Sequence, residues 1–125
     1  MIQFKTPRIE VEFKELFNRN RRLYQLILVA GQYSEFEFRK EVTITSLYRT
    51  PEENAALYAP NVEPISKPHT IWQAVDLRSV IYSAPEIYKF VQFLNLWTVF
   101  DGKKLTAFCH SIPGGSQHFH VQCNA

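Results

Sequence analysis

The histidines of this chain are few and unevenly placed. The sequence of 125 residues contains four, and three of them, His110, His118 and His120, fall within eleven residues near the C-terminus. His118 and His120 form an H-x-H pair. On a strand such a pair sends both imidazoles to the same face, because side chains alternate with a period of two. Imidazoles that share a face can act as metal ligands or as acid–base groups.

The fourth histidine, His69, stands seven residues before Asp76. This spacing is awkward within one helix. It suits a histidine at the end of a loop, followed by a strand that carries the aspartate, so that both side chains turn toward one point. Two histidines and one carboxylate, with a position left for water, are the composition of a catalytic zinc site. By spacing alone, zinc ligands and ordinary hydrogen-bonded strand histidines are equally good interpretations.

The first half of the chain supplies helices and one strand around these residues. Apolar side chains at helical spacing predict one or two helices over residues 8–31. The β-branched run within residues 41–48 predicts a strand. Pro51 and the two acids after it favour the start of a short helix, since proline fits the first turn and acids suit its positive end. Residues 60–70 contain several prolines and are predicted to form a loop.

The second half contains the strands that must carry Asp76 and the clustered histidines. A short strand is predicted at residues 74–77, and an amphipathic helix begins at Ala84 and continues through Trp97. Residues 104–110 and 118–123 are predicted to be strands on either side of a Pro-Gly-Gly turn.

Together these elements predict one α+β domain that spans residues 1–125. We expect a small, mainly antiparallel sheet with helices packed on one face. Across the last hairpin, His110 is expected to lie opposite or nearly opposite His118. A hydrophobic fraction of 46% and an aromatic fraction of 14% are sufficient for a core without disulfides or other staples.

Charge and cysteine content narrow the classes of partner. The net charge is only +2, and the one dense basic cluster, at Arg19, Arg21 and Arg22, is interpreted as a solvated helix face. No nucleic-acid partner is therefore expected. Cys109 and Cys123 do not form a C-x-x-C pair and are interpreted as reduced, buried thiols.

The sequence shows no segment that would insert into a membrane. Its first ten residues lack an apolar signal-peptide core, and its longest apolar run, at residues 26–30, is far too short to span a bilayer. We therefore expect synthesis in the cytoplasm without a signal peptide. The protein is also expected to be a monomer.

Three segments occur in a recognisable order from about residue 40 to the C-terminus. Residues 45–52 are T-S-L-Y-R-T-P-E, residues 69–76 are H-T-I-W-Q-A-V-D, and residues 118–121 are H-F-H-V. They resemble the zinc DD-peptidase superfamily, whose pattern is S-x-Y-R-[ST], then H-x-x-G-x-A-x-D, then a late E-x-x-H or H-x-H. That superfamily includes D-alanyl-D-alanine carboxypeptidases, phage endolysin peptidases, penicillin-insensitive murein endopeptidases and the hedgehog signalling domain.

The resemblance implies a hedgehog/DD-peptidase-like fold and zinc ligands at His69, Asp76 and His120. It also implies that Arg49 binds substrate and stabilises the oxyanion, where negative charge develops during hydrolysis. Many members place a general-base glutamate shortly before the last ligand, and this sequence has none there. His118 would take that role, as the first residue of H-x-H.

Other substrate-binding positions depart from the family pattern. The serine that often stands two residues before the first ligand is replaced by lysine, with Ser66 one residue further away. Trp72 replaces the glycine of H-x-x-G and is expected to wall the cleft or reduce its depth. His110 is interpreted either as a residue that orients His118 or holds substrate, or as a passive strand residue.

The expected function is that of a zinc metallopeptidase. It would cleave D-Ala-type or cross-bridge peptide bonds of bacterial peptidoglycan, would be encoded by a phage or prophage, and would reach the cell wall by release through a holin or by carriage in a virion. The alternative is a non-catalytic zinc-stabilised binding module or virion structural module on the same fold, as the hedgehog domain illustrates.

Overall fold

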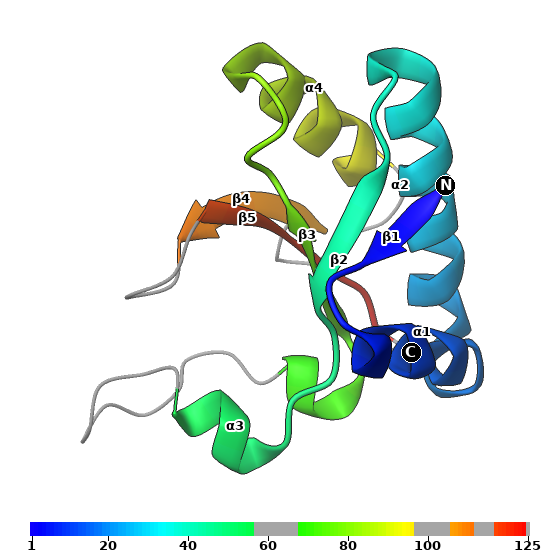
Figure 1. The fold of residues 1–125 in the computed structure, drawn as a ribbon, viewed down its shortest axis with the longest axis vertical. Helices are drawn as coiled ribbons and strands as arrows, with labels where there is room; N and C mark the ends of the chain where they lie inside the picture. The colour runs from blue at the N-terminus through cyan, green and yellow to red at the C-terminus, as the bar shows by residue number, and fades with distance from the viewer. Residues whose placement is uncertain (57–67, 97–105, 112–116, 125) are drawn as a thin grey trace.

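The structure is a computed structural model that describes residues 1–56, 68–111 without 97–105, and 117–124 (Figure 1). Its elements in chain order are β1 (Ile2–Phe4), α1 (Pro7–Arg19), α2 (Arg21–Phe38), β2 (Val42–Ser46), α3 (Pro51–Ala55), the 3-10 helix η1 (Pro68–Ile71), β3 (Ala74–Arg78), α4 (Ala84–Asn95), β4 (Ala107–Ser111) and β5 (Gln117–Gln122). The predicted Pro-Gly-Gly turn, most of the predicted 60–70 loop, and Trp97 lie outside the described residues.

The strands form one five-stranded sheet in the order β1-β2-β3-β5-β4. Three neighbouring pairs are antiparallel, and only β1 and β2 run parallel. The prediction of an α+β domain with a small, mainly antiparallel sheet is therefore confirmed. Strand β1 was not predicted, because three residues are too few to display a period of two.

Two helices cover the region where one or two were predicted. α1 begins after Thr6, whose side chain accepts a hydrogen bond from the Ile9 amide, and has a proline in its first turn. α2 continues to Phe38, seven residues beyond the predicted limit. Within residues 32–38 only Tyr33, Phe36 and Phe38 are apolar, which breaks the helical spacing of the preceding residues. The helix nevertheless keeps burying its inner face, down to Ser34.

The three longer helices pack against the sheet to form the hydrophobic core. Its members include Leu16 of α1, Ile27 of α2 and Phe90 of α4, together with Leu77 and Phe119 of the sheet. Figure 1 shows α2 and α4 on one side, with α3 well apart from both. The face of β3 and β5 opposite to this core is consequently left for other side chains.

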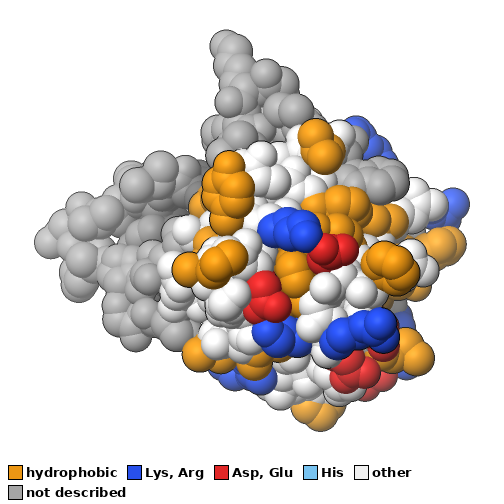
Figure 2. All heavy atoms as spheres, turned by 90° about the horizontal axis from the view of Figure 1, so that it is seen from above, with side chains coloured by type: hydrophobic (Ala, Val, Ile, Leu, Met, Phe, Trp, Pro, Cys, Tyr) orange, Lys and Arg blue, Asp and Glu red, His pale blue; other side chains and the backbone are white. Residues whose placement is uncertain are grey.

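Positive and negative side chains are mixed on the surface. Figure 2 shows basic and acidic side chains interspersed with apolar ones on the visible face. Arg19 pairs with Glu15 at 2.9 Å, and the Arg21 guanidinium lies 4.1 Å from the centroid of the Phe17 ring. Arg19 is thus paired within α1, and Arg21 of α2 contacts the neighbouring helix α1. The absence of a nucleic-acid partner stays a prediction.

Both cysteines are free thiols in the structure. Cys123 is buried, whereas Cys109 is only half-buried, so the prediction of two buried thiols is confirmed for one of them. Within the described residues, no helix is sufficiently long and apolar to cross a membrane.

Candidate metal centre

His69, Asp76 and His120 converge on one buried point. Their ligand atoms all lie within 4.8 Å of one another. The Asp76 Oδ1 is 3.2 Å from Nε2 of His69 and 3.2 Å from Nδ1 of His120. The three residues are exposed by only 1%, 2% and 5% respectively. The convergence predicted from the sequence is therefore present, and the group could hold a metal ion.

Strand register brings two of these residues together. β3 and β5 pair antiparallel with Asp76 directly opposite His120, so both side chains leave the sheet on the same face. On the neighbouring positions of both strands, Val75, Leu77 and Phe119 point into the hydrophobic core. The period of two thus divides each strand between core and site.

His69 comes from a separate segment that is fastened to the sheet by backbone hydrogen bonds. It lies in η1 rather than at the end of a loop, which corrects the prediction for this residue. The Arg49 amide donates to the His69 carbonyl at 3.3 Å, and the Gln73 amide donates to the Pro68 carbonyl at 2.7 Å. These bonds fix the histidine relative to both β2 and β3.

In each imidazole one nitrogen faces Asp76 (the inner nitrogen) and the other points away from it (the outer nitrogen). Each outer nitrogen contacts an oxygen atom. His69 Nδ1 lies 2.6 Å from the Leu47 carbonyl, and His120 Nε2 lies 3.0 Å from Oε1 of Gln122. A carbonyl oxygen can only accept a hydrogen bond, so the outer nitrogens carry hydrogen. In neutral imidazoles this leaves a lone pair on each inner nitrogen, facing the Asp76 carboxylate. Such outer partners are typical of histidines that bind metals.

The buried Asp76 carboxylate requires a positively charged partner. Burial acts to raise the pKa of the Asp76 carboxyl. When the imidazoles are protonated on both nitrogens, the charge of His69 and the hydrogen bonds from His120 and His69 outweigh burial and hold this pKa well below its usual range. A buried carboxylate that faces two lone pairs is strongly unfavourable. Either inner-nitrogen protons or a bound divalent ion can neutralise it, and two imidazoles with one carboxylate are suitable ligands for such an ion.

His118 joins this group, as its H-x-H spacing predicts. Its Nε2 lies 3.5 Å from Oδ2 of Asp76, and its side chain is 10% exposed. An imidazole at this position could exchange protons with a molecule bound beside the carboxylate. The backbone of His110 lies opposite His118 in the β4–β5 pairing, as expected, but its side chain is outside the described structure, as is the whole of Ser66.

Arg49 adjoins the first histidine through the backbone and lines a hollow of about 230 Å³ with Ser46 and Leu47. The hollow therefore lies beside residues 47–49, the segment whose backbone is hydrogen-bonded to His69. The assignment of Arg49 to substrate binding stays a prediction.

Trp72 adopts the left-handed conformation, with φ of 59°. Glycine is favoured in this region because it has no Cβ, and the resembled family has glycine at this position. The Trp72 ring stacks on Tyr48 with centroids 4.7 Å apart, and the Arg19 guanidinium lies 5.6 Å from its centroid. These contacts are with Tyr48 and α1 rather than with the metal group. Its assignment to a substrate cleft stays a prediction.

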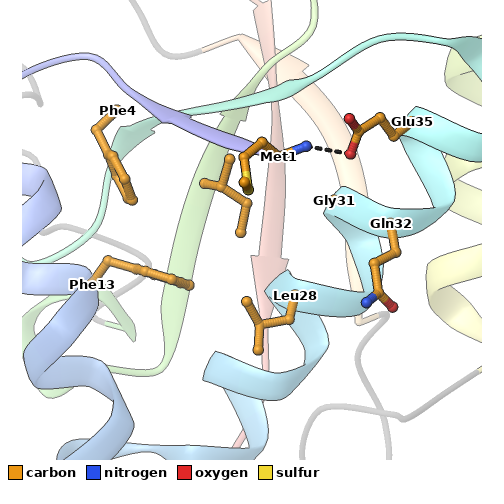
Figure 3. A pocket seen from close by; sticks show the side chains of 8 residues that line it. Met1, Phe4, Phe13, Leu28, Gly31, Gln32 and Glu35 are labelled. Carbon is orange, nitrogen blue, oxygen red and sulfur yellow. Dashed lines mark hydrogen bonds and ion pairs between the residues drawn. The ribbon is translucent and has the colours of Figure 1, made fainter.

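A larger apolar groove of about 490 Å³ lies elsewhere, between β1, α1 and α2 (Figure 3). Its walls include Phe4, Phe13 and Leu28, and the N-terminal amine pairs with Glu35 at its edge. None of its lining residues belongs to the candidate metal group.

The sequence patterns do not predict the two oxygen atoms that contact the imidazoles on the side away from Asp76. Gln122 could have been found, since it stands two residues after His120 and must therefore share its face of the strand. The Leu47 carbonyl could not have been found, because a backbone acceptor leaves no mark in the choice of side chain.

Fold and site together define a small α+β domain with a buried His–Asp–His group that could bind a metal. Comparison with protein-family models, with curated proteins and with solved structures gave no match to this chain.

Proposed function

We propose that this chain is a zinc metallopeptidase of the DD-peptidase type, with His69, Asp76 and His120 as the metal ligands. The observation that carries the proposal is that these three residues, from η1, β3 and β5, meet in one buried group. The donor set of two imidazoles and a carboxylate is that of catalytic zinc sites with an open coordination position. The positive φ of Trp72, at the glycine position of the H-x-x-G pattern, gives the resemblance independent support.

The proposed chemistry divides between the ion and the side chains around it. Bound zinc supplies Lewis-acid chemistry, which polarises a carbonyl group and activates water near neutral pH. His118 accepts a proton at Nε2 and returns it to the leaving amine, and Asp76 Oδ2, 3.5 Å away, stabilises the imidazolium form. Arg49 offers a fixed positive charge where negative charge develops on the substrate.

The proposed substrate is a peptide of bacterial peptidoglycan, cleaved at a D-Ala-type or cross-bridge bond. This choice is supported by the three ordered motifs, and with it we propose that the protein is encoded by a phage or prophage. It would reach its substrate by release through a holin or as part of a virion.

The test combines metal analysis with digestion of purified peptidoglycan and mass spectrometry of the fragments. We expect one zinc per chain and release of fragments cut at a peptide bond. His120→Ala should lose both, whereas Gln117→Ala, an exposed residue of the same strand, should keep both. Muralytic activity that survives in His120→Ala would overturn the mechanism.

The alternative is a non-catalytic zinc-stabilised module for binding or for virion structure. Two observations favour it: no glutamate precedes His120 in the last motif, and Trp72 fills the glycine position with a bulky ring that packs on Tyr48. Stoichiometric zinc and a raised unfolding temperature, with no turnover of any peptidoglycan fragment, would favour this function over the peptidase.

A further inference from the structure

Gln122 is buried beside the candidate metal group and has no place in the motifs. It is exposed by only 5%, and the strand alternation puts it on the same face of β5 as His120. The backbone amide of Gln122 donates to the Thr106 carbonyl at 2.8 Å, which fixes the end of the strand. A polar side chain buried this deeply is expected to have a specific partner.

We propose that Gln122 is a positioning residue that holds His120 in the tautomer with hydrogen on Nε2 and so presents Nδ1 to the metal. The proposal rests on the metal centre proposed above and adds a residue to it. Its basis is the 3.0 Å contact between His120 Nε2 and Gln122 Oε1, together with the 3.2 Å contact between His120 Nδ1 and Asp76 Oδ1.

Two acceptors compete for the single hydrogen of a neutral His120. If Nδ1 carried it, the imidazole would donate to Asp76, and the nitrogen facing the metal position would be blocked. If Nε2 carries it, the imidazole donates to Gln122, and Nδ1 keeps the lone pair that a metal requires. Without the Gln122 oxygen, Asp76 would favour the blocked tautomer. Gln122 therefore raises metal affinity by opposing a preference of the aspartate.

The two histidine ligands solve the same problem with different atoms. His69 Nδ1 is held by a backbone carbonyl, that of Leu47, at 2.6 Å. No substitution of a side chain removes this oxygen. For His120 the corresponding oxygen belongs to a side chain, so its contribution can be measured.

The variants are chosen to change the acceptor while keeping the shape. Gln122→Met has a similar length and no strong acceptor, and Gln122→Glu offers oxygen atoms only. Outer partners of metal-binding histidines typically contribute about 10- to 100-fold to metal affinity. We expect Gln122→Met to weaken zinc binding by that factor and Gln122→Glu to bind as tightly as the wild type or more tightly. Gln117→Met, at the exposed start of the same strand, is the matched control and should change nothing.

Zinc affinity is measured by competition with a chelating dye, and the visible spectrum of the cobalt form reports ligand geometry. The tautomer is read independently by ¹⁵N NMR of metal-free protein at about pH 8.5, well above the ordinary pKa of histidine. We expect the wild type and Gln122→Glu to carry hydrogen on Nε2 of His120, and Gln122→Met to shift toward Nδ1.

Unchanged zinc affinity in a folded Gln122→Met, or an equal loss in Gln117→Met, would overturn the proposal. So would hydrogen on Nδ1 in the metal-free wild type, a measurement that decides the matter even if Gln122→Met does not fold. A wild type that binds no zinc would refute the proposed function instead, and the NMR spectrum would still report whether Gln122 sets the tautomer.

Discussion

The two faces of β3 and β5 differ in what holds them. On the core face, Val75, Leu77 and Phe119 are completely buried among the helices. On the other face, Asp76 and His120 are almost as deeply buried, but they are hydrogen-bonded to each other and to further polar groups. Burial is therefore nearly equal on both faces, while its energetic meaning is opposite. Apolar burial stabilises the fold, whereas burial of a carboxylate requires compensation.

Polar side chains at these two buried positions contribute less to stability than apolar side chains would. A face built for packing alone would carry apolar residues at the positions of Asp76 and His120, next to the Phe108 ring that stacks on His120 at 4.9 Å. Polar groups at such positions are expected where a function requires them.

The largest loss of stability is expected on the core face. Phe119→Ala removes a ring that contacts Phe90 at 5.1 Å and Tyr82 at 5.6 Å between centroids. It should lower the free energy of unfolding by about 3–5 kcal/mol, the usual cost of a cavity of this size. Urea unfolding of metal-free protein measures it. Phe108→Ala, on the other face and only half-buried, should lose clearly less, and equal losses would remove the distinction between the faces.

The site face should gain its stability from metal. At free zinc of 100 times the dissociation constant, a ligand specific for the folded state adds about 2.7 kcal/mol to the free energy of unfolding. We expect this gain in the wild type and none in Asp76→Asn, which keeps the shape but loses the carboxylate. Thermal unfolding with and without zinc measures both. Magnesium serves as the control ion and should have no effect, because it disfavours nitrogen ligands.

The sequence predicted those parts of the site that depend on strand alternation. Asp76 and His120 lie where a period of two puts them, and His118 follows from the H-x-H spacing. It could not predict that His69 lies in a 3-10 helix, because the position of that helix depends on hydrogen bonds with Leu47 and Arg49. Local patterns specify which face a side chain takes, but not which distant segment meets it.

The same limit explains why the sequence patterns do not predict β1 or the full length of α2. β1 consists of three residues and gains its identity from parallel pairing with β2, a contact about forty residues distant in sequence. α2 continues beyond the last residue with helical apolar spacing. There it is stabilised by tertiary packing of Ser34, whose hydroxyl is hydrogen-bonded to that of Tyr82 at 2.6 Å. In both places long-range contacts override local propensity.

Asn20 is a further long-range contact that local patterns could not reveal. Its side chain caps α2 by accepting from the Leu23 amide, and donates to the carbonyls of Trp72 and Cys123 at 3.0 and 2.8 Å. It thereby joins the junction of α1 and α2 to the segments that precede β3 and follow β5, which lie side by side at one end of the sheet. Asn20→Ala leaves these carbonyls without their donor and should lower the free energy of unfolding by about 1–3 kcal/mol.

Chemical denaturation tests this effect, with Asn18→Ala as the control. Asn18 is exposed near the end of α1, and its replacement should be nearly neutral. If Asn20→Ala lowers the free energy of zinc binding by more than it lowers the free energy of unfolding, Asn20 acts on the site in particular. An Asn20→Ala variant as stable as the wild type would contradict the prediction.

The smallest effect is expected from the exposed ion pair that supports the site from outside. Arg8 of α1 binds both carboxylate oxygens of Glu53 at 2.8 and 2.9 Å. It also binds Glu12, which accepts from the Tyr48 amide at 3.2 Å. The hydrogen bond from Arg8 is the main cause that lowers the pKa of Glu53 from 4.5 to about 2.

The sign of the pH dependence follows from this shift. A carboxyl whose pKa is lower in the folded state stabilises the fold above its unfolded pKa, and this contribution disappears as pH falls through the folded value. Glu53→Gln should therefore be slightly less stable than the wild type at pH 6, with the difference vanishing between about pH 4.5 and pH 2. Urea unfolding across this range measures it, and Glu52→Gln, which leaves the Arg8 pair intact, is the control. Because the pair is exposed, solvent weakens it. A constant difference at every pH would contradict the prediction, because it would mean that the charge of Glu53 does not stabilise the fold.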